Sequence, residues 1–112
     1  MSNQPDGCEP SLAAASLDPG EAAARARQFK ALGDPVRLRL LSMIASAHGE
    51  VCVCQLTGAF DVSPQTISHH LRVLREADLV SADRRGTWVY YRPVVERLRD
   101  LADVLDISRE LV

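Results

Sequence analysis

Two of the chain's three cysteines, Cys52 and Cys54, are separated by a single residue in the stretch EVCVCQL. Side chains two positions apart in a regular helix point about 200° from each other, so cysteines at this spacing cannot share an ion from mid-helix. They can share one at a helix start, if Cys52 is extended or in the cap position and Cys54 lies in the first turn. We expect the helix N-terminus to favour their thiolate forms, and soft thiolates select thiophilic ions. The spacing therefore predicts a site for a soft metal or metalloid.

A third donor is needed to complete such a site. Three thiolates suit trigonal trivalent arsenic or antimony, whereas tetrahedral zinc requires a fourth ligand. Cys8 is the only other thiol, and the chain from Cys8 to Pro19 can extend about 36 to 40 Å, enough to reach the pair in its own subunit or a partner's. Two alternatives stay open for the pair. The cysteines can be small apolar residues of the core, or they can form a dithiol that cycles with a disulfide. Cys8 can also be an incidental residue.

Length and composition limit the class of protein. A chain of 112 residues forms one domain, and it has neither an apolar run of membrane-helix length nor a signal-peptide pattern. An odd number of cysteines argues against a disulfide framework. We therefore expect a soluble, cytoplasmic protein with reduced thiols. We do not expect an enzyme, because the sequence shows no pair of nucleophile and base, no phosphate loop and no paired catalytic carboxylates.

Three predicted helices share one start signal, a capping residue followed by a proline in the first turn. The pairs are Asp18 with Pro19, Asp34 with Pro35, and Ser63 with Pro64. The first helix is predicted at about 20–31, the second ends before Gly49, and the third carries apolar residues at intervals of four and three. A short helix is predicted within 51–60. A short helix, a tight turn and a longer helix indicate a helix-turn-helix.

A hairpin and a final helix complete the predicted domain. Two β-prone segments, 79–82 and 87–91, flank the turn signal DRRG, and an amphipathic helix is predicted from Pro93. The predicted fold is therefore mainly α with a small β-hairpin wing, a dimeric winged helix-turn-helix. The predicted domain covers 19–108, between an N-terminal arm at 1–18 that carries Cys8 and a C-terminal tail at 109–112.

The predicted third helix has a polar face without an acid. If Ile67 points into the core, the polar residues point outward, and their side chains can hydrogen-bond to bases and phosphates. All but one of the 13 basic residues are arginine, which suits forked contacts with guanine or phosphate. The alternative is an ordinary polar surface, but the basic tip of the hairpin favours a nucleic-acid interface. The predicted DNA contacts are Gln65, Thr66, Ser68, His69 and Arg72 on the helix, with Arg84 and Arg85 on the hairpin.

Four other side chains have ambiguous positions in this pattern. His70 lies at the edge of the apolar stripe and is predicted to be partly buried and hydrogen-bonded to the backbone. Strand alternation places Trp88 and Tyr90 on one face and Tyr91 on the other, so at least one of these aromatic residues should belong to the core.

Four segments, ALGDPVRLRLL, GEVCVCQL, SPQTISHHLRVLREADLV and RRGTWVYYR, follow one another over about residues 29–92. Together they resemble the ArsR/SmtB family of winged-helix metal-responsive repressors. The resemblance implies a homodimer built from the first and last helices, which binds double-stranded operator DNA and leaves it when a metal or metalloid binds. Symmetry would place the two reading helices in successive major grooves, roughly 34 Å apart.

The resemblance also implies an inducer. Arsenic sensors of this family often carry a further cysteine three residues after the second, where this chain has Thr57. Some members complete the site from an N-terminal arm, which makes Cys8 the third candidate ligand beside Cys52 and Cys54. The family's other site, on the last helix, uses histidines, and no histidine follows His70. The expected inducer is thus arsenite or trivalent antimony, with no cofactor.

Three alternative functions stay open. The first is a cadmium or lead sensor that uses the same thiols with a further oxygen or nitrogen ligand. The second is a thiol-redox regulator, and the third is a winged helix that binds protein instead of DNA.

Overall fold

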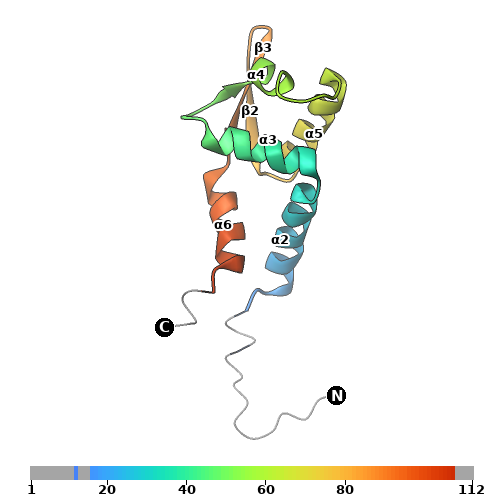
Figure 1. Ribbon diagram of the computed structural model, residues 1–112. Coiled ribbons are helices and arrows are strands. Elements are labelled where there is room, and N and C mark those ends of the chain that lie inside the picture. Colours follow the sequence, from blue (N-terminus) through green and yellow to red (C-terminus); the bar gives the residue numbers. More distant parts are fainter. Residues whose placement is uncertain (1–11, 13–15, 108–112) are drawn as a thin grey trace, which may run out of the picture.

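The computed structural model describes Leu12 and residues 16–107 (Figure 1). Cys8, most of the predicted N-terminal arm and the predicted tail at 109–112 lie outside the described residues. The elements in chain order are α2 (Pro19–Leu32), α3 (Pro35–Ser46), β1 (Val51–Cys52), α4 (Val53–Thr57), α5 (Pro64–Glu76), β2 (Val80–Arg85), β3 (Trp88–Pro93) and α6 (Val95–Leu105). The predicted fold class is confirmed, since short strands form a wing on a mainly helical domain.

The three predicted capping residues are confirmed. Asp18 accepts a hydrogen bond of 2.8 Å from the backbone N–H of Glu21, and Glu21 accepts one of 3.1 Å in return. Asp34 accepts from two backbone N–H groups of α3, and the bond from Arg37 is the main reason that the pKa of Asp34 is lowered. Ser63 accepts from the N–H of Thr66 at 3.2 Å. Each cap satisfies donors that a helix start leaves unpaired.

The hairpin and the last helix begin at different residues than predicted. Arg85 pairs with Trp88 across the wing, so the turn consists of the two residues between them, and the prediction of a DRRG turn was wrong. Gly86 adopts a φ of +64°, which favours glycine. The prediction that the last helix starts at Pro93 was also wrong, because Pro93 pairs with Val80 as the last residue of β3. Proline is tolerated there because a strand end does not require its missing N–H.

A third strand joins the wing. β1 pairs with β3 in antiparallel register, Val51 opposite Tyr91 and Cys52 opposite Tyr90, which gives the strand order β1-β3-β2. Two residues are too few to show a strand period, so the sequence pattern predicted only a two-stranded hairpin. The consequence is functional, because the first cysteine of the pair belongs to the sheet that carries the wing.

The core lies where α3, α4 and α5 meet the sheet. Ile67, Leu71 and Leu74 are fully buried, which confirms the predicted inward face of α5. Leu40 and Ile44 of α3, Leu56 of α4 and Leu79 before β2 are also fully buried. Among the described residues, no helix is both long and apolar enough to span a membrane.

The helices α2 and α6 project together from the opposite end of the molecule from the wing (Figure 1). They are joined by an ion pair of 2.6 Å between Arg25 and Asp100. Three apolar side chains at the end of α6 stay exposed: Val104 by 38%, Leu105 by 68% and Ile107 by 63%. An exposed apolar strip of this kind is typical of an interface.

We expect the substitution Leu71→Ala to lower the free energy of unfolding by about 2 to 5 kcal/mol, because it opens a cavity beneath the reading face of α5. Leu38→Ala is the matched control, since Leu38 is 53% exposed and should cost far less. Urea unfolding followed by circular dichroism measures both variants. Equal losses would show that the assigned core is incorrect.

Candidate metalloid site and nucleic-acid interface

The two cysteines converge at the start of α4. Cys52 is the N-cap residue, with φ −72° and ψ 142°, and Cys54 lies in the first turn. The Cys54 thiol donates to the sulfur of Cys52, and the two Sγ atoms lie 2.9 Å apart. The predicted geometry, with one cysteine extended and the other helical, is confirmed. Cys52 is buried and Cys54 is exposed, so the pair is anchored at one sulfur and open to a ligand at the other.

Hydrogen bonds between side chains and the backbone hold the pair in this arrangement. The N–H of Cys52 donates to the side-chain oxygen of Gln55 at 2.9 Å. Thr57, at the position of the family's third cysteine, donates its hydroxyl to the carbonyl of Cys54 at 3.2 Å. Thr57 thus supports the helix that carries Cys54. Among the residues that the structure describes, no three His, Cys, Asp or Glu side chains are grouped closely enough to hold a metal ion.

The surroundings of Cys54 favour its protonated thiol. The hydrogen bond to Cys52 raises the pKa of Cys54, with smaller contributions from burial and from the charge of the neighbouring sulfur. The backbone N–H groups of Gln55 and Cys54 lower this pKa by less. The expectation that the helix start favours a thiolate was therefore wrong for Cys54. The cause is that the adjacent sulfur outweighs the backbone N–H groups of a helix of only five residues.

The predicted reading face lies on the exposed side of α5. Gln65, Ser68, His69 and Arg72 are exposed there. Thr66 is half-buried, and its hydroxyl lies 3.0 Å from that of Ser63, so this side chain belongs to the cap at the helix start. The structure thus brings four of the five predicted helix residues to one accessible face.

A basic cleft lies between α5 and the wing. Arg72 and Arg75 of α5 face Arg84 of β2 across a cavity of about 450 Å³ whose lining contains no acidic residue. Ser68 and Tyr91 also line this cleft, and burial raises the pKa of Tyr91. Arg75 was not among the predicted contacts, although it lies only about 20° from Ser68 on the helical wheel and could have been included in the outward face. The cleft can receive a phosphate strand beside the reading helix.

Arg85 occupies a different environment from Arg84. Its guanidinium donates two hydrogen bonds to Glu50, of 2.8 and 2.7 Å, and one of 2.9 Å to Asp83. It also lies over the ring of Tyr90, at 4.6 Å from the centroid. These bonds lower the pKa of Glu50 and raise that of Arg85. Of the two predicted hairpin contacts, Arg84 lies in the cleft while Arg85 is bound to the residue just before β1.

His70 is half-buried, as predicted, but its partner is a side chain. Its Nδ1 lies 3.2 Å from Nη1 of Arg37, so the prediction of a backbone partner was wrong. Of the aromatic residues, Tyr91 packs against the core and Trp88 is 51% exposed. The prediction that one aromatic residue belongs to the core is thereby confirmed.

Comparison with known proteins places these features in a family. Residues 34–82 match the family of bacterial regulatory proteins described as the arsR family. An uncharacterized HTH-type transcriptional regulator of Methanocaldococcus jannaschii is 40% identical over 70% of this chain and 86% of its own. A transcriptional repressor SmtB homolog of Synechocystis is 45% identical over 83% and 70%. The arsenic resistance transcriptional regulator ArsR1 of Pseudomonas putida is 45% identical over 73% and 66%.

Solved structures of regulators from this family are also similar to the chain. A possible transcriptional regulator for arsenical resistance superposes with a TM-score of 0.65 at 38% identity, covering 71% of this chain and 81% of its own. A homodimeric winged helix-turn-helix DNA-binding domain from Mycobacterium bovis superposes with a TM-score of 0.64 at 31% identity, covering 98% and 92%. With its wing, reading helix and cysteine pair, the chain belongs to the ArsR/SmtB family of winged-helix transcriptional repressors.

Proposed function

We propose that this protein is an arsenite-responsive repressor. It binds operator DNA as a homodimer and leaves the DNA when trivalent arsenic, or antimony, binds the thiols of Cys52, Cys54 and Cys8. The observation that carries the proposal is the convergence of two sulfurs, 2.9 Å apart, at the start of α4, with one of them exposed. Cys8 is the candidate third donor because the described residues bring no His, Asp, Glu or further Cys side chain to the pair.

A protonated thiol suits arsenite chemistry. At neutral pH arsenite is As(OH)₃, and each thiol that binds forms one As–S bond while its proton leaves with an arsenic hydroxide as water. Three thiols thus release three waters, no proton is liberated, and no atom is oxidised or reduced. The raised pKa of Cys54 therefore presents no obstacle to arsenite. A divalent cation, in contrast, must displace the proton.

Ligand binding should change the shape of the pair. Two sulfurs that each bind one ion at about 2.3 Å lie roughly 3.5 to 4 Å apart. The sulfurs of Cys52 and Cys54 are closer, at 2.9 Å, so binding should separate them. Cys52 is paired with Tyr90 in the wing, and α4 packs between the sheet and α5. A hundredfold loss of operator affinity needs a coupling of only about 2.7 kcal/mol.

The dimer interface is proposed at α2 and α6. These helices project together from the opposite end of the molecule from the wing, and α6 ends in exposed apolar side chains. The homodimeric structure of the Mycobacterium bovis relative supports a dimer, and the choice of α2 and α6 rests on the exposed apolar side chains. A dimer would present two copies of α5 to successive major grooves of a near-palindromic operator.

X-ray absorption on the arsenite complex tests the ligand set. The native chain should show three sulfur neighbours around arsenic, and Cys8→Ser should show two with one oxygen. Three sulfurs in both proteins would remove Cys8 from the site. Fewer than two in the native protein would contradict binding by the pair itself.

A substitution at Glu50 tests whether the cysteine pair is coupled to DNA binding through the wing. Its carboxylate binds Arg85 of the wing, and it lies two residues before Cys52. We expect Glu50→Gln to reduce the effect of arsenite on operator affinity from about a hundredfold to less than tenfold, with arsenite still bound. The matched control is Asp83→Asn, which removes the other carboxylate on Arg85 but leaves the connection to β1. A full response in Glu50→Gln would assign the coupling to the contact between α4 and α5.

A cadmium sensor is the second candidate function. A cadmium resistance transcriptional regulatory protein CadC homolog of Staphylococcus aureus is 35% identical over 70% of this chain and 64% of its own. The pH dependence separates the candidates, since the raised pKa of Cys54 keeps its thiol protonated at neutral pH. Cadmium affinity should rise with pH until the Cys54 thiol has ionised. Arsenite affinity should stay constant around neutral pH, where As(OH)₃ and the Cys54 thiol both keep their protons.

Isothermal titration calorimetry in buffers of different ionisation enthalpy counts the protons released. We expect none for arsenite and about two for cadmium from the pair. The functional inducer is then identified by which of the two releases the operator at equal site occupancy. Release by cadmium alone would replace the arsenite assignment.

A further inference from the structure

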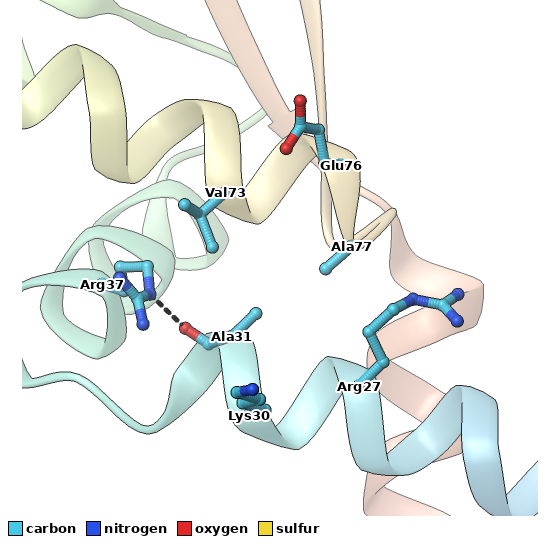
Figure 2. A pocket seen from close by; sticks show the side chains of 7 residues that line it. All are labelled: Arg27, Lys30, Ala31, Arg37, Val73, Glu76 and Ala77. Atoms are coloured by element: carbon cyan, nitrogen blue, oxygen red, sulfur yellow. Dashed lines mark hydrogen bonds between the residues drawn. The ribbon is translucent and has the colours of Figure 1, made fainter.

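A second basic groove lies on the other side of the reading helix. It forms between α2, α3 and α5, encloses about 260 Å³, and is lined by Arg27, Lys30, Arg37, Val73, Glu76 and Ala77 among others (Figure 2). Three cations thus surround an opening that contains one carboxylate. Figure 2 shows the Glu76 side chain directed away from α2, on the far rim from Lys30. The groove is separate from the cysteine pair and from the cleft beside the wing.

Two of these cations have no counter-ion among the described residues. Arg27 and Lys30 are exposed, and neither side chain forms a hydrogen bond or ion pair with any described residue. Arg25, on a different face of α2, is paired with Asp100 of α6 at 2.6 Å. The helix α2 thus satisfies its positive charge on the side of α6 and leaves it unsatisfied on the side of α5. Unneutralised cations that face one opening repel each other unless an anion occupies it.

Arg37 gives the groove a fixed component. Its Nε donates to the carbonyl oxygen of Ala31, drawn as the dashed line in Figure 2, and its Nη1 lies 3.2 Å from Nδ1 of His70. These contacts hold the guanidinium in place and leave Nη2 available. A guanidinium that is already oriented loses little entropy when it binds an anion, and its planar donors match phosphate oxygens.

The two basic clusters flank α5 on opposite sides. Val73 faces the groove and Arg75 faces the cleft beside the wing, and their directions differ by about 160° around the helix axis. A helix that enters a major groove, about 12 Å wide, has one phosphate strand on each flank. The groove therefore lies on the side of α5 where the second DNA strand would run, opposite the strand beside the wing.

We propose that Arg27, Lys30 and Arg37 form a second phosphate-binding cluster, which holds the DNA backbone on the α2 side of the reading helix. Arg72, Arg75 and Arg84 hold the strand on the wing side. This proposal rests on the proposed binding of operator DNA by α5. Because phosphate contacts carry no sequence information, the cluster contributes equally to binding of any duplex and fixes the register of α5 in its groove.

The salt dependence of binding tests the proposal. The double variant Arg27→Ala/Lys30→Ala is compared with the native dimer by fluorescence anisotropy, on an operator selected from random duplexes and on an unselected duplex. Each lost phosphate contact lowers the slope of log affinity against log salt by about 0.9, so the variant should lose about 1.8 per protomer on both duplexes. The control Arg39→Ala removes an exposed arginine of α3 that lies outside both basic clusters and outside the proposed dimer helices, and it should leave the slope unchanged.

The possible results separate this proposal from the proposed function. An unchanged slope in the double variant, with operator binding intact, would overturn the second cluster but not the operator site. Absence of DNA binding by the native protein would instead overturn the function on which the cluster rests. Inorganic phosphate at millimolar concentration, if it raises the melting temperature of the native protein but not of the variant while the slope stays unchanged, would assign the groove to a free anion. Loss of the dimer by sedimentation in the variant would assign it to the subunit interface.

Discussion

The substitution Cys54→Ser should abolish release of operator DNA by arsenite and leave the affinity of the arsenite-free protein for operator within about twofold. Cys54 is exposed, so serine replaces it with little effect on packing, and Gln55 still caps the backbone of Cys52. The hydroxyl of serine is a hard, weak ligand that does not substitute for a thiolate. With only two sulfurs left at best, the complex loses the coordination that moves the side chain of residue 54 away from the Cys52 sulfur.

Fluorescence anisotropy with labelled operator measures this effect as the ratio of affinities with and without saturating arsenite. The expected ratio falls from about a hundred in the native protein to about one in Cys54→Ser, which is a loss of about 2.7 kcal/mol of coupling. Cys8→Ser should retain a reduced response, because the pair itself is intact. A native response in Cys54→Ser would show that the inducer binds elsewhere.

The substitution Arg72→Ala should have the second largest effect, a loss of operator affinity of about 5- to 150-fold. Arg72 is exposed, lies both on the reading face of α5 and in the cleft with Arg84, and has no ion-pair partner among the described residues. An arginine that binds a guanine edge contributes about 1 to 3 kcal/mol of discrimination, and one that binds phosphate contributes equally to all sequences.

Comparison of selected and random duplexes decides which role Arg72 has. A loss confined to the selected operator indicates base recognition, and an equal loss on both indicates phosphate binding. Arg85→Ala is the matched control in the wing. The Nε of Arg85 donates to Asp83 and its Nη1 and Nη2 donate to Glu50, so this guanidinium is already occupied by carboxylates. A larger effect for Arg85→Ala than for Arg72→Ala would contradict the assigned interface.

Much of this fold could be predicted because its helices start with local signals. The pairs Asp18–Pro19, Asp34–Pro35 and Ser63–Pro64 act within one turn, and the stripe of Ile67, Leu71 and Leu74 is read directly from spacing. The position of the cysteines followed from the same logic, since a helix start can bring residues two apart together and mid-helix geometry cannot.

What the sequence could not supply were contacts between distant residues. The pairing of Cys52 with Tyr90 and the bonds between Glu50 and Arg85 join segments more than thirty residues apart, and no local pattern encodes them. The raised pKa of Cys54 likewise depends on the 2.9 Å approach of another sulfur, which outweighs the local backbone. The groove beside α2 was missed because its cations come from separate helices.

The most direct test of the account is a titration of arsenite into the native dimer bound to its selected operator, with all thiols reduced and metal ions removed. Arsenite that saturates the thiols should lower operator affinity by about a hundredfold, and a dithiol chelator should restore it. Unchanged affinity at full occupancy of the Cys52 and Cys54 sulfurs would contradict the claim that this pair controls the affinity of α5 for DNA.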